Sequence, residues 1–167
     1  MVNDYSEILN VANEGKPKIV IVPPVDKEDN EEQLEKTVDL LFRISSKVKH
    51  GQRNEHWVTL FVDEAHLFSP KHSRDDALQK VARMGVGHGI YLVTISQRPA
   101  NISHDVLTQA GETYVFKLTE WERPYMDKYF PNYDEYEEWL KKPYHFIRID
   151  PDGEVTKMRP IPKRFAT

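Results

Sequence analysis

Short apolar runs alternate with helical segments along most of this 167-residue chain, and this alternation constrains its fold more than any other feature. The runs are residues 18–22, 58–62, 90–95 and 113–118. Each is nearly continuous in β-branched, aliphatic or aromatic residues, which is typical of strands covered on both faces. Segments with helical spacing of apolar residues separate them, the longest at residues 31–49. Strands that alternate with helices predict an α/β fold on a mostly parallel sheet.

Capping residues indicate where the predicted helices begin and end. Asp29 or Asn30 is a suitable N-cap for the first helix, and Gly51 is a suitable stop. Ser103 is a suitable N-cap for a later helix that reaches residue 110. A further helix is expected over about residues 75–84. These signals support the alternation of strands and helices.

The C-terminal part of the chain has a different pattern. Residues 144–149 and 154–158 read as two short strands, and the pair Asp152-Gly153 between them favours a tight turn. We therefore expect a small antiparallel hairpin at the C-terminal edge of the sheet. The length suits one domain, which we place at residues 1–160, with residues 161–167 as an arm or loose tail.

Composition excludes several classes of protein. The chain has no Cys, so disulfides, thiolate metal sites and Cys nucleophiles are excluded. No apolar run approaches the roughly 18–20 residues that span a membrane, and the N-terminus does not resemble a signal peptide. We therefore expect a cytoplasmic protein with no membrane partner. The formal net charge of −4 means that nucleic-acid binding would need a local basic surface.

The strongest chemical signal is a pair of carboxylates at the end of the second apolar run. Asp63 and Glu64 follow the strand residues Val58–Val62 directly. Ligands of open α/β sheets bind beyond the carboxyl ends of the strands. There Asp63 can hold Mg²⁺ through its water shell, and Glu64 can take a proton from an attacking water. This is the Walker B arrangement, although a strand followed by an ordinary Asp-containing turn has the same sequence pattern.

A second signal lies at the tip of the next strand, where Gln97, Arg98 and Pro99 follow the run at residues 90–95. The amide of Gln97 can orient a water molecule or contact a γ-phosphate. Arg98 is a candidate for a phosphate or interface contact. The competing interpretation of these three residues is a surface loop.

Taken in order, these motifs resemble the FtsK/HerA superfamily of P-loop ATPases, most closely its HerA branch. The matching stretches are residues 63–70, 89–95, 96–100 and 105–111, within a resemblance that covers roughly residues 18–125. The resemblance implies a RecA-like three-layer sandwich that forms a homo-oligomeric, hexameric ring, uses ATP and Mg²⁺, and moves or packages double-stranded DNA. It also implies that Asp63 holds Mg²⁺, Glu64 polarises water and Gln97 senses the γ-phosphate.

Two features depart from that family. The P-loop pattern Gly-x-x-x-x-Gly-Lys-Ser/Thr does not occur, and the single Gly-Lys pair, Gly15-Lys16, is followed by Pro17. The P-loop strand is therefore expected to be absent, and the phosphate cradle must come from elsewhere, for example from a partner chain. The family also places basic residues just before its fourth core strand, some of which act across subunits. Arg83 is the nearest basic candidate for such a finger.

Two other functions remain open at this point. The chain could be a RecA-like remnant without a P-loop that acts as a non-catalytic interaction or assembly module. The string Asp63-Glu64-Ala65-His66 is also that of DEAH-type helicases, so a fragment of such a helicase is a minor alternative. Such a helicase would be expected to carry Ser/Thr-Ala-Thr where this chain has Ser96-Gln97-Arg98. The retained set of Asp63, Glu64 and Gln97 favours the ATPase.

Overall fold

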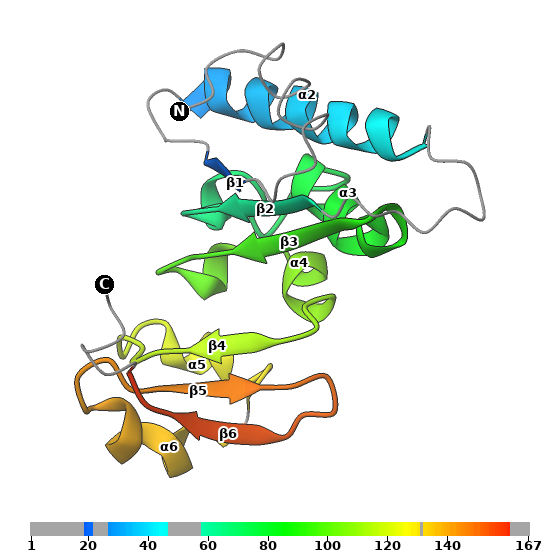
Figure 1. The fold of residues 1–167 in the computed structure, drawn as a ribbon. Coiled ribbons are helices and arrows are strands. Elements are labelled where there is room, and N and C mark those ends of the chain that lie inside the picture. The colour runs from blue at the N-terminus through cyan, green and yellow to red at the C-terminus, as the bar shows by residue number, and fades with distance from the viewer. Residues whose placement is uncertain (1–18, 22–26, 47–57, 131, 161–167) are drawn as a thin grey trace. The chain divides into compact units, whose positions relative to one another are not determined.

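The computed structural model describes residues 19–21, 27–46, 58–130 and 132–160 (Figure 1). The chain divides into two compact units, residues 1–109 (unit 1) and residues 110–167 (unit 2). Each unit has a sheet and a core of its own. The placement of residues 1–160 in one domain stays a prediction, and residues 161–167 lie outside the described residues.

Unit 1 is built on a parallel sheet of three strands, in the order β1 (Ile19–Ile21), β2 (Val58–Val62) and β3 (Ile90–Thr94). β2 and β3 pair residue for residue, from Val58 opposite Ile90 to Val62 opposite Thr94. This confirms the parallel pairing of the first three predicted strands. Because β2 and β3 end level with one another, the residues that follow each strand begin at the same edge of the sheet.

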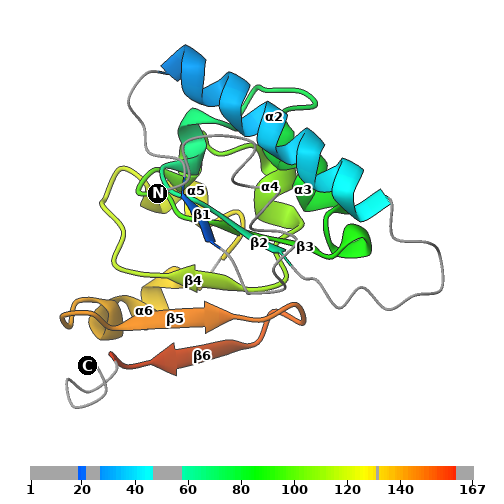
Figure 2. The same ribbon diagram turned by 45° about the horizontal axis from the view of Figure 1, so that its top comes forward.

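Among its described residues, unit 1 has the α-helices α2 (Lys27–Ser46), α3 (Ala77–Met84) and α4 (His104–Thr108). Short 3₁₀ turns occur at η1 (Ala65–Leu67), η2 (Val86–His88) and η3 (Pro99–Asn101). α2 runs alongside α3 in both views of the ribbon (Figure 1, Figure 2). The core of unit 1 joins these helices to β2 and β3; its buried side chains are Leu34, Val38, Leu41, Leu60, Val62, Ala65, Phe68, Leu78, Val81, Ile90, Ile102 and Val106.

The helix boundaries differ in part from those expected. α2 begins at Lys27, so Asp29 and Asn30 lie inside the helix and the N-cap prediction is wrong. Polar residues near a helix start fit its first turn as well as its cap, which is why the sequence did not separate the two. Ser103 is confirmed as the N-cap of α4, since its hydroxyl accepts a hydrogen bond from the Val106 N–H. Gly51 lies outside the described residues.

Unit 2 contains an antiparallel sheet in the order β4 (Thr113–Val115), β5 (Phe146–Ile149) and β6 (Val155–Met158). Two helices, α5 (Arg123–Met126) and α6 (Tyr133–Leu140), belong to the same unit. The predicted hairpin is confirmed, since β5 pairs antiparallel with β6 and Gly153 adopts φ +82° in the turn, but it joins β4 in a separate sheet rather than the edge of the parallel sheet. The core of unit 2 comprises Val115, Met126, Phe130, Tyr133, Leu140 and Ile147.

β4 corrects one expectation from the sequence. The run at residues 113–118 was expected to be a parallel strand, but the strand is only three residues long and pairs antiparallel with β5. Its side chains explain the difference, because Val115 is buried while Tyr114 and Phe116 are 52% and 53% exposed. Alternation of a buried and an exposed face is typical of antiparallel strands. Because the exposed face here carries aromatic residues, the stretch looks like a continuous apolar run in the sequence.

The structure thus confirms an α/β fold with a parallel sheet and a C-terminal antiparallel hairpin. Within the described residues, no helix is both long enough and apolar enough to cross a lipid bilayer.

Candidate functional site

The carboxyl ends of β2 and β3 are joined by hydrogen bonds that continue past the two strands. The Ile95 N–H donates to the Val62 carbonyl (2.9 Å), and the Ala65 N–H donates to the Ile95 carbonyl (3.0 Å). Asp63 and Glu64 lie between these two anchoring points, and Asp63 is exposed. The backbone ladder therefore fixes where the two carboxylates leave the sheet.

Glu64 has an unusual backbone conformation. Its φ of 49° and ψ of 43° are left-handed, a region that residues with a Cβ atom seldom occupy. The turn is supported by the Glu64 N–H, which donates to Asp63 Oδ1 at 2.8 Å. In this conformation Glu64 Oε1 accepts a hydrogen bond from Gln97 Nε2 at 3.3 Å. The structure thus brings together the three residues that the sequence proposed for one site, Asp63, Glu64 and Gln97.

Two side chains that the sequence reasoning did not assign to the site lie against Glu64. His66 Nδ1 is 3.3 Å from Glu64 Oε2 and 3.0 Å from Ser96 Oγ. Ser96 Oγ also accepts a hydrogen bond from the Arg98 N–H at 3.0 Å. His66 and Ser96 both lie inside the motif stretches, but no spacing rule predicts that they meet. Their meeting depends on the register between β2 and β3.

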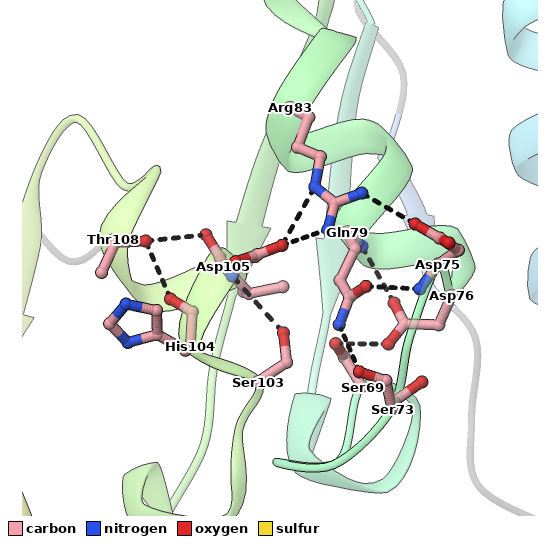
Figure 3. Close-up of polar contacts among 11 residues, drawn as sticks. Ser69, Ser73, Asp75, Asp76, Gln79, Arg83, Ser103, His104, Asp105 and Thr108 are labelled. Atoms are coloured by element: carbon pink, nitrogen blue, oxygen red, sulfur yellow. Dashed lines mark hydrogen bonds and ion pairs between the residues drawn. The ribbon is translucent and has the colours of Figure 1, made fainter.

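The two arginine candidates occupy different surroundings. The Arg98 side chain is exposed at the tip of β3, beside Gln97 in the chain. Arg83 lies on the last turn of α3, where its Nε donates to Asp105 (3.0 Å) and its Nη1 to Asp75 (2.8 Å) (Figure 3). The hydrogen bonds that Arg83 donates to Asp105 and, to a lesser extent, to Asp75 raise the pKa of Arg83 above its usual range. Arg83 therefore belongs to a separate cluster of charges, and its role as a finger across subunits stays a prediction.

A buried polar network holds the segment that follows Glu64 against α3. The Ser69 hydroxyl, which is fully buried, donates to Asp76 Oδ2 at 2.7 Å (Figure 3). Asp76 Oδ1 accepts from the Gln79 N–H at 2.9 Å and caps α3. The Ser69 carbonyl in turn accepts from the Ser103 N–H (2.8 Å). The network therefore connects the chain after Glu64 to the chain after Gln97.

We expect Asp76→Ala to lower the stability of unit 1 by roughly 2–4 kcal/mol. The substitution removes a helix N-cap, worth about 1 kcal/mol, and leaves the buried Ser69 hydroxyl without its acceptor, which costs about 1–3 kcal/mol more. The free energy of unfolding, measured by urea denaturation followed by circular dichroism, checks this. Asp76→Asn is the matched control, because Asn caps as well as Asp and can still pair with Ser69. Equal losses in both variants would contradict the explanation.

A cavity of about 280 Å³ lies over this polar cluster. Its lining residues are Lys71, Ser73, Arg74, Asp75, Gln79, Arg83, Ser103, His104 and Asp105. None of them is Asp63, Glu64 or Gln97. The concentration of carboxylate and amide groups at the strand tips, rather than this cavity, therefore defines the candidate site.

Asp63 provides a suitable but incomplete position for Mg²⁺. Mg²⁺ is usually bound by one or two carboxylates together with waters and substrate phosphates. Asp63 offers one exposed carboxylate at the sheet edge. Within the described residues, no group of three His, Cys, Asp or Glu side chains could form a protein-only metal site. The residues fit an ion held mainly by water and phosphate oxygens.

Two curated relatives carry the name HerA. The chain is 39% identical over 66 residues to the probable DNA double-strand break repair helicase HerA of Methanocaldococcus jannaschii, covering 38% of this chain and 13% of that protein. It is 26% identical over 96 residues to the DNA double-strand break repair helicase HerA of Pyrococcus furiosus, covering 56% and 17%. The chain thus spans less than a fifth of the length of these relatives. No protein-family model matches it.

The fold is shared with a viral protein. The structure matches the genome packaging NTPase B204 of Sulfolobus turreted icosahedral virus 2 in complex with AMP, with a TM-score of 0.65 and 18% identity over 92% of this chain and 88% of that chain. The complex of the same NTPase with ATP-gammaS gives a TM-score of 0.65 and 19% identity over the same shares. These matches confirm the RecA-like α/β fold. Together with the two HerA relatives, they confirm that this chain resembles the FtsK/HerA superfamily of P-loop ATPases.

Proposed function

We propose that this chain supplies the water-activating half of a HerA-like ATPase that couples ATP hydrolysis to the translocation or packaging of double-stranded DNA. The observation that carries the proposal is the contact between Glu64 Oε1 and Gln97 Nε2, 3.3 Å apart at the carboxyl ends of adjacent parallel strands. Ligands of parallel sheets bind beyond these ends, where loops leave room for them. A carboxylate and an amide at this separation can both contact one water molecule.

Each residue has a distinct task in this proposal. Glu64 accepts a proton from the attacking water, and Gln97 orients that water and senses the γ-phosphate. Asp63 holds Mg²⁺ through water, and the ion, when bound, neutralises charge that develops on the phosphates. Arg98, exposed beside Gln97, contacts phosphate or a neighbouring subunit.

The phosphate cradle is the part that these 167 residues do not provide, since no P-loop pattern occurs among them. The proposal therefore includes a Gly-rich loop and Lys contributed from outside this sequence, for example by a partner chain. A ring of subunits would bring such elements together and could enclose DNA. The names of the relatives, a DNA repair helicase and a genome packaging NTPase, support DNA as the substrate that is moved.

Titration of Mg-ATP into the chain, followed by calorimetry, tests the proposal, with Asp63→Ala as the paired variant. The same titration is made on the complex that a tagged copy of the chain recovers from its source. We expect Mg-ATP to bind the complex and Asp63→Ala to weaken that binding at least about tenfold, because a metal ligand is lost.

The outcomes separate the proposal from its alternatives. Binding that Asp63→Ala weakens supports a nucleotide site at the ends of β2 and β3. Absence of Mg-ATP binding both in the chain and in the recovered complex would contradict the proposal. That result would favour the non-catalytic assembly module, in which Asp63, Glu64 and Gln97 have no nucleotide to contact.

A further inference from the structure

The surroundings of Glu64 Oε2 carry a further inference. This oxygen is covered from solvent, and it has no partner with hydrogen-bond geometry among the described residues. His66 Nδ1 nevertheless lies 3.3 Å from it, close enough for the charge on the carboxylate to act on that nitrogen. The His66 side chain is only 11% exposed, so water does not screen the pair effectively. Whether His66 Nδ1 carries a proton therefore decides whether its contact with Glu64 Oε2 is attractive or repulsive.

The contact of His66 Nδ1 with Ser96 Oγ does not show whether this nitrogen carries a proton. His66 Nδ1 is 3.0 Å from Ser96 Oγ, and a hydroxyl can donate to a bare ring nitrogen or accept from a protonated one. A carboxylate oxygen, in contrast, can only accept. If Nδ1 carried a lone pair, it would face the lone pairs of Oε2 across 3.3 Å. If Nδ1 carries the proton, Ser96 Oγ can accept it, and the charge on Oε2 is attracted to the N–H rather than repelled by a lone pair.

We propose that His66 is a positioning residue for Glu64: its Nδ1–H, donated to Ser96 Oγ, attracts the charge on Glu64 Oε2 3.3 Å away and so fixes the carboxylate with Oε1 facing Gln97. The contacts tie the tip of β2 to the tip of β3 through side chains, in addition to the backbone ladder. Ser96 is itself fixed, because its Oγ accepts the Arg98 N–H. The effect of His66 on ATP hydrolysis rests on the proposed function. The presence of a proton on His66 Nδ1 does not.

Nuclear magnetic resonance of the ¹⁵N-labelled chain tests the proton position, at a pH at which the imidazole ring is neutral. We expect His66 to be protonated on Nδ1. In Glu64→Ala, the tautomer should shift toward Nε2–H, since the carboxylate that disfavours a bare Nδ1 is gone and Ser96 can donate to that nitrogen. His88 is the internal control: its Nδ1 is also 3.0 Å from a serine hydroxyl, that of Ser45. A bare Nδ1 in wild-type His66, or a tautomer that Glu64→Ala leaves unchanged, would overturn the proposal.

A second measurement tests the consequence in the recovered complex, through hydrolysis by His66→Leu and His66→Asn. The side-chain amide of Asn can place an N–H near the position of Nδ1, whereas Leu cannot donate. We expect His66→Leu to lower kcat by about 10- to 100-fold with KM nearly unchanged, and His66→Asn to restore most of the rate. Equal loss in both variants would overturn the positioning role. A wild-type complex that hydrolyses no ATP would overturn the proposed function, while the resonance measurement would still decide the proton position.

Discussion

Glu64→Gln is expected to stop ATP hydrolysis in the complex that contains this chain while leaving ATP binding intact. The substitution keeps the size of the side chain and its contact with Gln97, but an amide cannot take a proton from water. Loss of a general base lowers kcat by about 100- to 10,000-fold. Steady-state hydrolysis assays and Mg-ATP titrations on the same preparation check the two halves of this expectation.

Glu135→Gln is the control for this substitution. Glu135 is an exposed carboxylate on α6, outside the segments that follow β2 and β3, so its substitution removes the same charge from a residue with no assigned role in the candidate site. Hydrolysis by the Glu135→Gln complex should equal that of the wild type. A kcat that Glu64→Gln lowers by less than about tenfold would refute the role of Glu64 as the base. Simultaneous loss of ATP binding would mean that its carboxylate is needed earlier, to hold the nucleotide.

Leu78→Ala is expected to lower the free energy of unfolding by about 2–5 kcal/mol. Leu78 is fully buried on α3, within the core that joins α2 and α3 to the sheet of unit 1. Truncation removes apolar contacts and leaves a cavity that the surrounding close-packed side chains fill only in part. Because a whole domain is stable by only about 5–15 kcal/mol, such a loss is a large share of the total. Urea denaturation followed by circular dichroism measures it.

Met84→Ala provides the comparison within the same helix. The Met84 side chain is 47% exposed at the end of α3, so its truncation should change the free energy of unfolding by less than about 0.5 kcal/mol. A loss in Leu78→Ala no greater than that in Met84→Ala would mean that the core does not pack α3 as described.

The strands and the main site residues could be predicted because both depend on short stretches of sequence. β2 and β3 are continuous apolar runs, and a parallel pair places the residues after each strand at one edge. That rule places Asp63, Glu64 and Gln97 at one edge, and the resemblance to the FtsK/HerA superfamily supplies their expected roles. The left-handed turn at Glu64 was not predictable, because Glu is not a residue that favours it.

The polar contacts beyond the strand tips depend on tertiary register. Ser69 meets Asp76, and Arg83 meets Asp105, only after α3 and α4 have packed. Neither contact is predicted from the sequence, and Ser69, a polar residue, is fully buried. β4 shows the opposite error: its exposed aromatic residues read as core. Polarity alone, without the position of neighbouring elements, therefore predicts some buried polar residues to be exposed and some exposed aromatic residues to be buried.

The backbone of Glu64 also bears on how this protein can change over generations. A left-handed conformation costs a residue with a Cβ atom roughly 1–2 kcal/mol, a cost that glycine avoids. Selection for a more robust fold would favour glycine at this position, and selection for a carboxylate beside Gln97 would oppose it. Stability and activity thus pull this position in opposite directions, as they often do where strain is kept at functional sites.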